Sequence, residues 1–231
     1  MMKEYEAMEQ ARIERNLVHA KNGVKFIDIK QAYIDEDVKI GQGTVIYPCV
    51  VIEGSVTIGE NCLIGQNTRI VDSVIGNGTE IQSSVITQSS IGDETKVGPF
   101  AYLRPKSKVG SHCKVGDFVE VKNSSMGDGS KASHLTYIGD SDIGEDVNIG
   151  CGVVFVNYDG TNKHRSTIKD GAFIGCNTNL VSPITVEEKA YIGAGSTVTA
   201  DVKAGSLFVA RAKGKALEGW VARRGLLDKK K

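Results

Sequence analysis

The chain has 231 residues, which is enough for one or two ordinary domains with a buried core. Its 28 lysines and arginines balance its 28 aspartates and glutamates, so no global positive field would recruit nucleic acid or a membrane surface. No apolar run in the sequence approaches transmembrane length. The 27 glycines, beside only 6% aromatic residues, favour many tight turns over a bulky globular core.

The N-terminal segment MMKEYEAMEQ is charged and lacks the apolar stretch of a signal peptide, so we expect a cytoplasmic protein. Residues 1–23 carry a weak apolar stripe at helical spacing, and we interpret them as a helical arm or a linker remnant. The five cysteines include no CxxC pair, which favours neither a disulfide framework nor a zinc site. We interpret Cys62 and Cys113 as fillers of small buried sites.

A six-residue repeat begins at Ile34 and runs through most of the chain. An aliphatic residue returns at Ile34, Ile40, Ile46, Ile52, Ile58, Ile64 and Ile70, and the pattern continues, with a few one-residue slips, to Val198. A period of six fits neither a helix nor one long strand, and it is the hexapeptide pattern of a parallel β-helix. We expect about three hexads to close a triangular coil, with the aliphatic side chains inside.

The repeat is lost between Phe155 and Ile168, where VNYDGTNKHRST intervenes. The Asp159-Gly160 pair is a turn signal, and a loop that leaves a regular scaffold is a usual place for function. A tolerated surface insertion is the alternative. After the repeat, the motif around Trp220, the only tryptophan, predicts an extension that packs on another surface, followed by a solvated basic tail.

These patterns predict an all-β architecture with short additions at both ends. The parallel β-helix is expected over residues 24–212, and a C-terminal extension with its basic tail over residues 213–231.

The candidate catalytic residue is His134, in the sequence KASHLTY. It stands two residues after the inward-facing Ala132, whereas His19 and His112 have positions typical of surface residues. A neutral imidazole is suited to take a proton from an attacking amine. His134 is therefore the expected general base of a group transfer.

Three cations are expected near His134, namely Arg104, Lys122 and Lys163. On neighbouring coils they would form a cluster suited to a sugar phosphate. The backbone N–H groups of the glycine-rich turn at 149–152 would stabilise an oxyanion. No base is evident beside Cys151 or Cys176, so we expect direct transfer without a covalent acyl-enzyme.

Several motifs then resemble one known family. RPKSKVG, VGDFVEVK, GSKASHLTYIGD, IGEDVNIG, VNYDGTNK and EGW are similar to the acetyltransferase domain of the bifunctional N-acetylglucosamine-1-phosphate uridyltransferase/glucosamine-1-phosphate acetyltransferase family, from about Val24 to Trp220. The resemblance implies a left-handed coil, acetyl-CoA as cosubstrate, no metal requirement for the transfer, and a homotrimer with sites between subunits. No uridyltransferase activity is expected, because no glycine-rich nucleotide loop precedes the repeat.

The resemblance also implies roles for individual residues. His134 would be the general base, with Glu120 a nearby polar partner. The residues that would bind the amino-sugar phosphate are Arg104, Lys122, Tyr137, Asn148 and Lys163. The residues that would line the acetyl-CoA site are Cys151, Asn157, Tyr158, Cys176, Ala194 and Arg211, with the N–H of Cys151 near the thioester oxygen. Cys151 and Cys176 stand where the family commonly has alanine and serine.

The expected reaction is N-acetylation of glucosamine 1-phosphate to N-acetylglucosamine 1-phosphate, a step toward UDP-N-acetylglucosamine and peptidoglycan precursors of the cell wall. One alternative is an acetyltransferase for another amino sugar or amine. A second is a metal-dependent hydratase, which would need about three converging histidines and is disfavoured by the wide separation of the four present. A third is a non-catalytic β-helix subunit that serves assembly.

Overall fold

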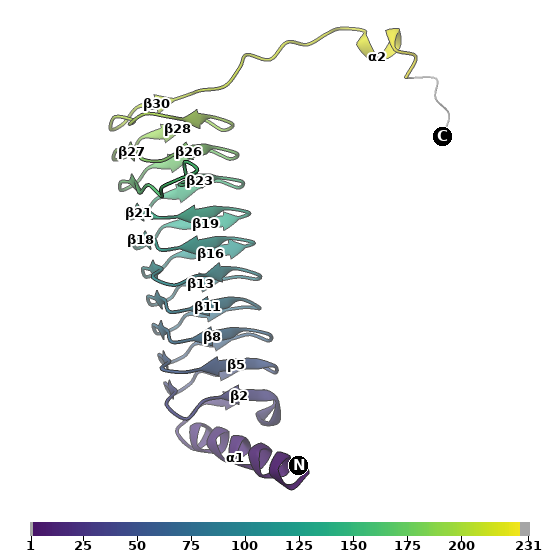
Figure 1. The fold of residues 1–231 in the computed structure, drawn as a ribbon, viewed down its shortest axis with the longest axis vertical. Helices are drawn as coiled ribbons and strands as arrows, with labels where there is room; N and C mark the ends of the chain where they lie inside the picture. Colours follow the sequence, from purple (N-terminus) through teal and green to yellow (C-terminus); the bar gives the residue numbers. More distant parts are fainter. Residues whose placement is uncertain (1, 227–231) are drawn as a thin grey trace.

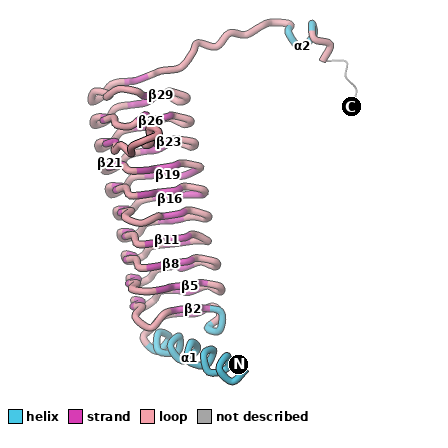
Figure 2. The backbone as a smooth tube through the Cα atoms, in the orientation of Figure 1, coloured by secondary structure: helices cyan, strands magenta, loops and turns pink. Residues whose placement is uncertain are grey.

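A stack of flat coils rises from an N-terminal helix, as Figure 1 shows. The computed structural model describes residues 2–226. The helix is α1 (Met2–Lys21), a short 3₁₀ helix η1 (Ile29–Gln31) follows it, and a second short helix α2 (Trp220–Arg223) lies near the C-terminus. Figure 2 shows that the strands between them recur once per side of each coil and are joined by turns.

The strands form three parallel sheets, which are the three sides of the coil. Sheet A contains β1 (Lys25–Phe26), β4 (Val45–Ile46), β7 (Leu63–Ile64), β10 (Glu80–Ile81), β13 (Lys96–Val97), β16 (Lys114–Asp117), β19 (Lys131–His134), β22 (Asn148–Ile149), β25 (Phe173–Ile174), β28 (Tyr191–Ile192) and β30 (Leu207–Phe208). Sheet B contains β2 (Ala32–Ile34), β5 (Val50–Glu53), β8 (Arg69–Val71), β11 (Val85–Thr87), β14 (Tyr102–Leu103), β17 (Glu120–Lys122), β20 (Tyr137–Gly139), β23 (Val154–Val156), β26 (Asn179–Val181) and β29 (Thr197–Val198). Sheet C contains β3 (Lys39–Ile40), β6 (Thr57–Ile58), β9 (Val74–Ile75), β12 (Ser90–Ile91), β15 (Lys108–Val109), β18 (Ser125–Met126), β21 (Ser141–Ile143), β24 (Ser166–Ile168) and β27 (Thr185–Val186).

The hexad register places the aliphatic residues inside the coil. Ile46 pairs with Ile64 and Ile64 with Ile81, and all three side chains are 0% exposed. Each coil therefore contributes one layer of aliphatic side chains to a core that runs along the axis. The predicted fold class, a left-handed parallel β-helix with an N-terminal helix, is confirmed.

The corners of the coil are filled by small residues. Thr44 is fully buried, and its hydroxyl donates to the Gly59 carbonyl at 2.8 Å while accepting from the Cys62 N–H at 3.0 Å. Cys62 and Cys113 are buried free thiols. A hydroxyl can be buried at a corner because it both donates and accepts a hydrogen bond there.

The helix α1 covers the first coil instead of extending into solvent as a free arm. Asn16 is 0% exposed, and its side-chain amide donates to the carbonyls of Ile29 at 2.8 Å and Ala32 at 3.0 Å. Arg12 also donates to the Ala32 carbonyl. These bonds supply donors to the open edge of the coil stack, which would otherwise present unpaired carbonyls.

The C-terminal segment leaves the coil stack after β30 (Figure 1). Trp220 begins α2, is 43% exposed, and has the Arg224 guanidinium 5.6 Å from its ring centre. The predicted solvated tail at residues 227–231 lies outside the described residues. Within residues 2–226, no helix combines the length and apolar composition needed to cross a membrane.

Candidate active site

Four of the predicted site residues lie in one column along the edge where sheet A turns into sheet B, called here the A–B edge. His134, Cys151, Cys176 and Ala194 each follow an inward-facing residue of sheet A by two positions. Those inward residues, Ala132, Ile149, Ile174 and Ile192, pair in register on successive coils. Neighbouring members of the column are therefore separated by about the 4.8 Å spacing of paired strands.

His134 is held in one orientation by a carboxylate on the preceding coil. Asp117 pairs in register with His134, and its Oδ1 lies 2.5 Å from the imidazole Nδ1. The hydrogen bond from His134 keeps the pKa of Asp117 below its ordinary value, so this carboxyl is ionised and only accepts. Nδ1 of His134 must then carry the proton, which leaves Nε2 of the neutral ring as a base.

The chain turns sharply directly after His134. Leu135 has φ 47°, in the left-handed region that a branched side chain seldom adopts, and its N–H donates to the Asp117 carbonyl at 2.9 Å. The same φ recurs at other turns of the coil, such as Asn61 (φ 55°) and Phe118 (φ 56°), so the conformation is a feature of the repeat. Here the turn leaves the imidazole of His134 on the outside of the edge, with its side chain 53% exposed.

The turn one coil further on presents a free backbone donor. The Gly150 N–H donates to the Ile174 carbonyl and the Gly152 N–H to the Leu135 carbonyl. Between them, the Cys151 N–H has no hydrogen-bond acceptor within residues 2–226. A free N–H one coil away from the base has the chemistry needed to stabilise a developing oxyanion.

The three predicted cations gather at the far end of the sheet B strands. Arg104 follows β14, and its guanidinium donates to Glu120 at 2.8 Å. Lys122 ends β17, and its ammonium donates to Asp140 at 3.0 Å. Contact with the Lys122 ammonium, together with its charge, lowers the pKa of Lys163. The cluster is thus present, although Lys163 reaches it from the loop and not from a coil.

Asp140 connects this cluster to the loop that interrupts the repeat. Its side chain accepts from Lys122, from Asn123 at 2.6 Å and from Asn157 at 2.5 Å. Burial raises the pKa of Asp140, but the hydrogen bonds outweigh burial and lower it. The Asn157 amide also lies 3.4 Å from the Tyr137 hydroxyl, so both predicted residues belong to the same cluster.

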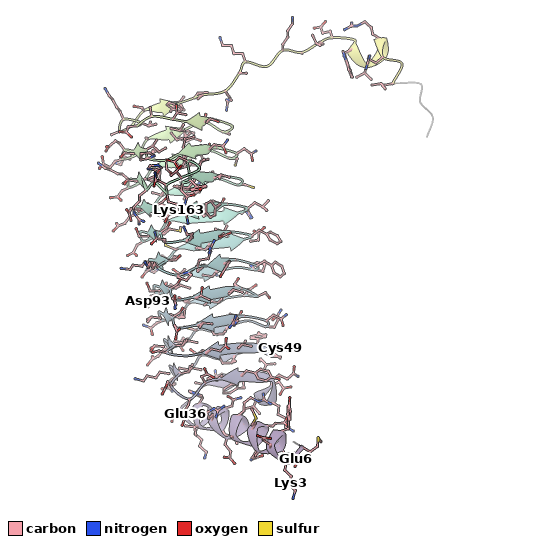
Figure 3. The ribbon with its side chains drawn as sticks, in the orientation of Figure 1. Lys3, Glu6, Glu36, Cys49, Asp93 and Lys163 are labelled. Atoms are coloured by element: carbon pink, nitrogen blue, oxygen red, sulfur yellow. The ribbon has the colours of Figure 1, made fainter. Side chains whose placement is uncertain are left out.

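The loop itself has a defined shape that holds Lys163, labelled in Figure 3, against Lys122 of sheet B. Asp159 accepts hydrogen bonds from the N–H groups of Thr161 at 2.7 Å and Asn162 at 2.6 Å. The pKa of Asp159 is lowered, and the hydrogen bond from the Asn162 N–H is the largest cause. A bridge joins Tyr158 to Lys163 in antiparallel fashion. This short hairpin brings the Lys163 side chain back toward the coil, so the interruption is a built element of the site.

The cations lie at the opposite end of sheet B from the A–B edge, so the single chain does not place them beside His134 as expected. Asn148 and Arg211 also lie away from the cations. Asn148 is on sheet A, paired with Lys131 and Phe173, whereas the cations are on sheet B. Arg211 follows β30 at the end of the A–B edge, where its guanidinium donates to the Ala194 carbonyl. Arg211 thus extends the column of His134, and Asn148 occupies another side of the prism.

The sequence analysis missed Asp117 and Asp140. A signal for Asp117 was present, because it stands two residues after the inward-facing Val115, as His134 stands after Ala132, one coil later. Asp140 gave no comparable signal, since its partners come from two other elements. Among residues 2–226, no group of three or more histidine, cysteine or acidic side chains is arranged to hold a metal ion.

Comparison with known proteins identifies sequences that are similar to this chain. Residues 88–123 match the family described as bacterial transferase hexapeptide (six repeats), and residues 28–103 match the GMPPB C-terminal domain. "Bifunctional protein GlmU" of Clostridium beijerinckii is 57% identical over 96% of this chain and 49% of its own length. The protein of the same name from Clostridioides difficile is 55% identical over 96% of this chain and 48% of its own length.

Among solved structures, an Arabidopsis UDP-N-acetylglucosamine acyltransferase aligns with 84% of this chain and 75% of its own, at 18% identity and a TM-score of 0.46. That distant likeness carries no weight beside the sequence matches. The chain spans about half the length of the curated relatives it matches. Over that half it is similar to the proteins named bifunctional GlmU, and its residues 88–123 match the bacterial transferase hexapeptide model.

Proposed function

We propose that this chain transfers the acetyl group of acetyl-CoA to the 2-amino group of glucosamine 1-phosphate. The observation that carries the proposal is the His134–Asp117 pair, whose free Nε2 faces out one coil away from the unpaired Cys151 N–H. A base and an oxyanion donor on the same edge are the two groups that direct acyl transfer requires.

The reaction would proceed without a covalent acyl-enzyme. The acceptor nitrogen attacks the thioester carbon while Nε2 of His134 takes the ammonium proton, and the Cys151 N–H stabilises the oxyanion. Collapse of this intermediate forms the amide, breaks the carbon–sulfur bond, and returns the proton from His134 to the CoA thiolate. A positioned general base contributes about 10²- to 10⁴-fold to such a step.

The cation cluster favours an acceptor that carries a phosphate. Arg104 and Lys122 are each matched by a carboxylate, while Lys163 has no ion pair within residues 2–226. The cluster therefore has an uncompensated positive charge at Lys163, and a dianionic phosphate would relieve the repulsion between Lys163 and Lys122. Tyr137 and Asn148 would contact the sugar.

The acetyl-CoA site would follow the A–B edge upward from His134. Cys151, Cys176, Ala194 and Arg211 present small side chains and a terminal cation along the successive coils. An extended pantetheine arm would lie along this column, with Asn157 and Tyr158 reaching the thioester from sheet B of a neighbouring subunit. We expect no metal to take part in the transfer.

A homotrimer with its sites between subunits completes the proposal. His134 lies on an exposed outer edge, and Asn148 lies on a different side of the prism from the cations. A second copy that placed its sheet A against sheet B of the first would bring its His134 and Asn148 to the cations of the first. Cyclic assemblies arise from such heterologous contacts.

The test is product formation from an acceptor panel, with the assembly state measured by light scattering. The purified chain is incubated with acetyl-CoA and glucosamine 1-phosphate, glucosamine 6-phosphate or glucosamine, and products are identified by mass spectrometry. N-acetylglucosamine 1-phosphate as the preferred product supports the proposal. Preference for another amine would indicate a sister acetyltransferase, and acetyl-CoA binding without turnover would indicate a non-catalytic subunit.

A further inference from the structure

The A–B edge holds two free thiols at equivalent positions of adjacent coils. Cys176 is exposed and Cys151 is partly buried, and the Asn177 N–H donates to the Cys151 carbonyl at 2.8 Å. The turns are in tight contact, since a Cβ added at Gly150 would lie 2.9 Å from the Cys176 Cα. The mechanism proposed above uses the Cys151 N–H but neither thiol.

The spacing of these two residues suits a disulfide. Ile149 and Ile174 pair in register, and each cysteine follows its isoleucine by two positions, so the cysteine Cα atoms are about one strand spacing of 4.8 Å apart, within the roughly 4.4–6.8 Å range of natural disulfides. Side chains at equivalent positions of stacked coils leave the edge in the same direction, so the two thiols face the same space.

The other cysteines within the structure lack such a neighbour. Cys62 and Cys113 are buried, and burial raises the pKa of both thiols, which disfavours the reactive thiolate. Cys49 is exposed but lies in the N-terminal part of the stack, far from Lys163 and the site (Figure 3). An oxidant would therefore produce an internal crosslink at one place only.

We propose that Cys151 and Cys176 form a peroxide-oxidisable thiol pair whose disulfide closes the acyl-donor column beside His134. The Cys176 thiolate attacks the peroxide O–O bond, which gives a sulfenic acid and one water after protonation. The Cys151 thiol then attacks the sulfenic sulfur and releases a second water. Two thiols lose two protons and two electrons, and hydrogen peroxide is reduced to two waters.

The consequence for acyl transfer rests on the proposed function. A disulfide between the two turns would pull the Cys151 turn toward Cys176 and move its N–H away from the thioester oxygen. It would also occupy the space along which the donor is expected to lie. Oxidation should therefore weaken acetyl-CoA binding, and a thiol reductant should restore it.

The experiment treats the full, previously reduced chain with hydrogen peroxide and maps its cysteines by mass spectrometry without reduction. The native chain and Cys49→Ser should each lose roughly 2 Da, the mass of two hydrogens, as one peptide linking Cys151 to Cys176 appears. Cys176→Ser should show no such peptide. Separate sulfenic or sulfinic acids at the two positions, or crosslinks only between chains, would overturn the proposal.

Calorimetry with acetyl-CoA, in the absence of an acceptor, measures the effect on the donor site. Each variant is compared with its own untreated sample, so a change in basal affinity does not affect the result. Oxidised native chain should bind at least about tenfold more weakly, a difference of about 1.4 kcal/mol, with recovery after reduction. Unchanged affinity in the disulfide form would refute closure. Absence of acetyl-CoA binding in the reduced chain would instead refute the proposed donor site. The cysteine mapping would then still show whether Cys151 and Cys176 form a disulfide.

Discussion

Replacing Asp117 by asparagine tests whether the carboxylate sets the chemistry of His134. The substitution keeps the size of the side chain and removes its charge. An amide can accept from Nδ1 as the carboxylate does, but its NH₂ group can also donate to Nδ1 and shift the imidazole proton to Nε2. In that tautomer Nε2 of His134 can no longer take a proton from the acceptor amine.

The expected effect is on turnover and not on folding. The Asp117 and His134 side chains are 36% and 53% exposed, so their hydrogen bond is a surface contact that contributes little to stability. We expect kcat to fall by about 10- to 100-fold, part of the roughly 10²- to 10⁴-fold that a positioned base contributes. The KM for the acceptor should stay nearly constant, because Asp117 does not touch the cation cluster.

The assay follows CoA release at saturating acetyl-CoA over a range of glucosamine 1-phosphate concentrations. Glu94→Gln is the matched control, since Glu94 pairs with the surface imidazole of His112 at 3.3 Å and lies outside the site. The control should keep native kcat. If Asp117→Asn also keeps native kcat with an unchanged melting temperature, the carboxylate does not orient His134 and the reasoning fails.

Three further predictions concern the core, the buried carboxylate and the cation cluster. Ile75→Ala should lower the free energy of unfolding by about 2–5 kcal/mol, whereas Val74→Ala on the outer face of the same strand should change it by less than about 0.5 kcal/mol. Urea unfolding measures both variants. Equal losses of stability would contradict the inward position of Ile75 in the hexad. Asp140→Asn should lower the melting temperature at neutral pH. Because the folded pKa of Asp140 is lowered, the stability that this carboxylate contributes is present above the ordinary value of 3.8 and is lost as pH falls through the folded pKa. The difference in melting temperature between the variant and the native chain should therefore disappear in acid, and a difference that stays constant with pH would contradict this role of Asp140. The pKa of Lys163 is lowered by Lys122, so the KM for glucosamine 1-phosphate should rise in alkaline solution before an ordinary lysine loses its proton; a Lys163→Met variant that retains that rise would exclude this lysine as its source.

The core could be predicted from sequence because a solenoid is nearly one-dimensional. Each inward residue, such as Ile64 or Ile138, contacts equivalents one coil away, so the spacing of six alone fixes its environment. Thr44, four residues after Ile40, is buried at a corner in keeping with the same spacing. The spacing failed to place Asn16, a polar residue that is buried because its amide satisfies carbonyls at the end of the stack.

The site could be predicted only where it follows the repeat. His134 and Cys176 share a hexad position, and the structure places them on one edge. The contact of Lys163 with Lys122 depends on a loop hairpin organised by Asp159, and no repeat rule describes that shape. The cations were predicted from the sequence, whereas their carboxylate partners became apparent only in the structure.

The most direct test of the central claim compares His134→Ala with His112→Ala in acceptor-dependent CoA release. Both substitutions remove an exposed imidazole that is paired with a carboxylate, but only His134 lies beside the free N–H of Cys151. With glucosamine 1-phosphate as acceptor, we expect release to be nearly abolished in His134→Ala and unchanged in His112→Ala. Equal release by the two folded variants would contradict the assignment of His134 as the general base of acetyl transfer.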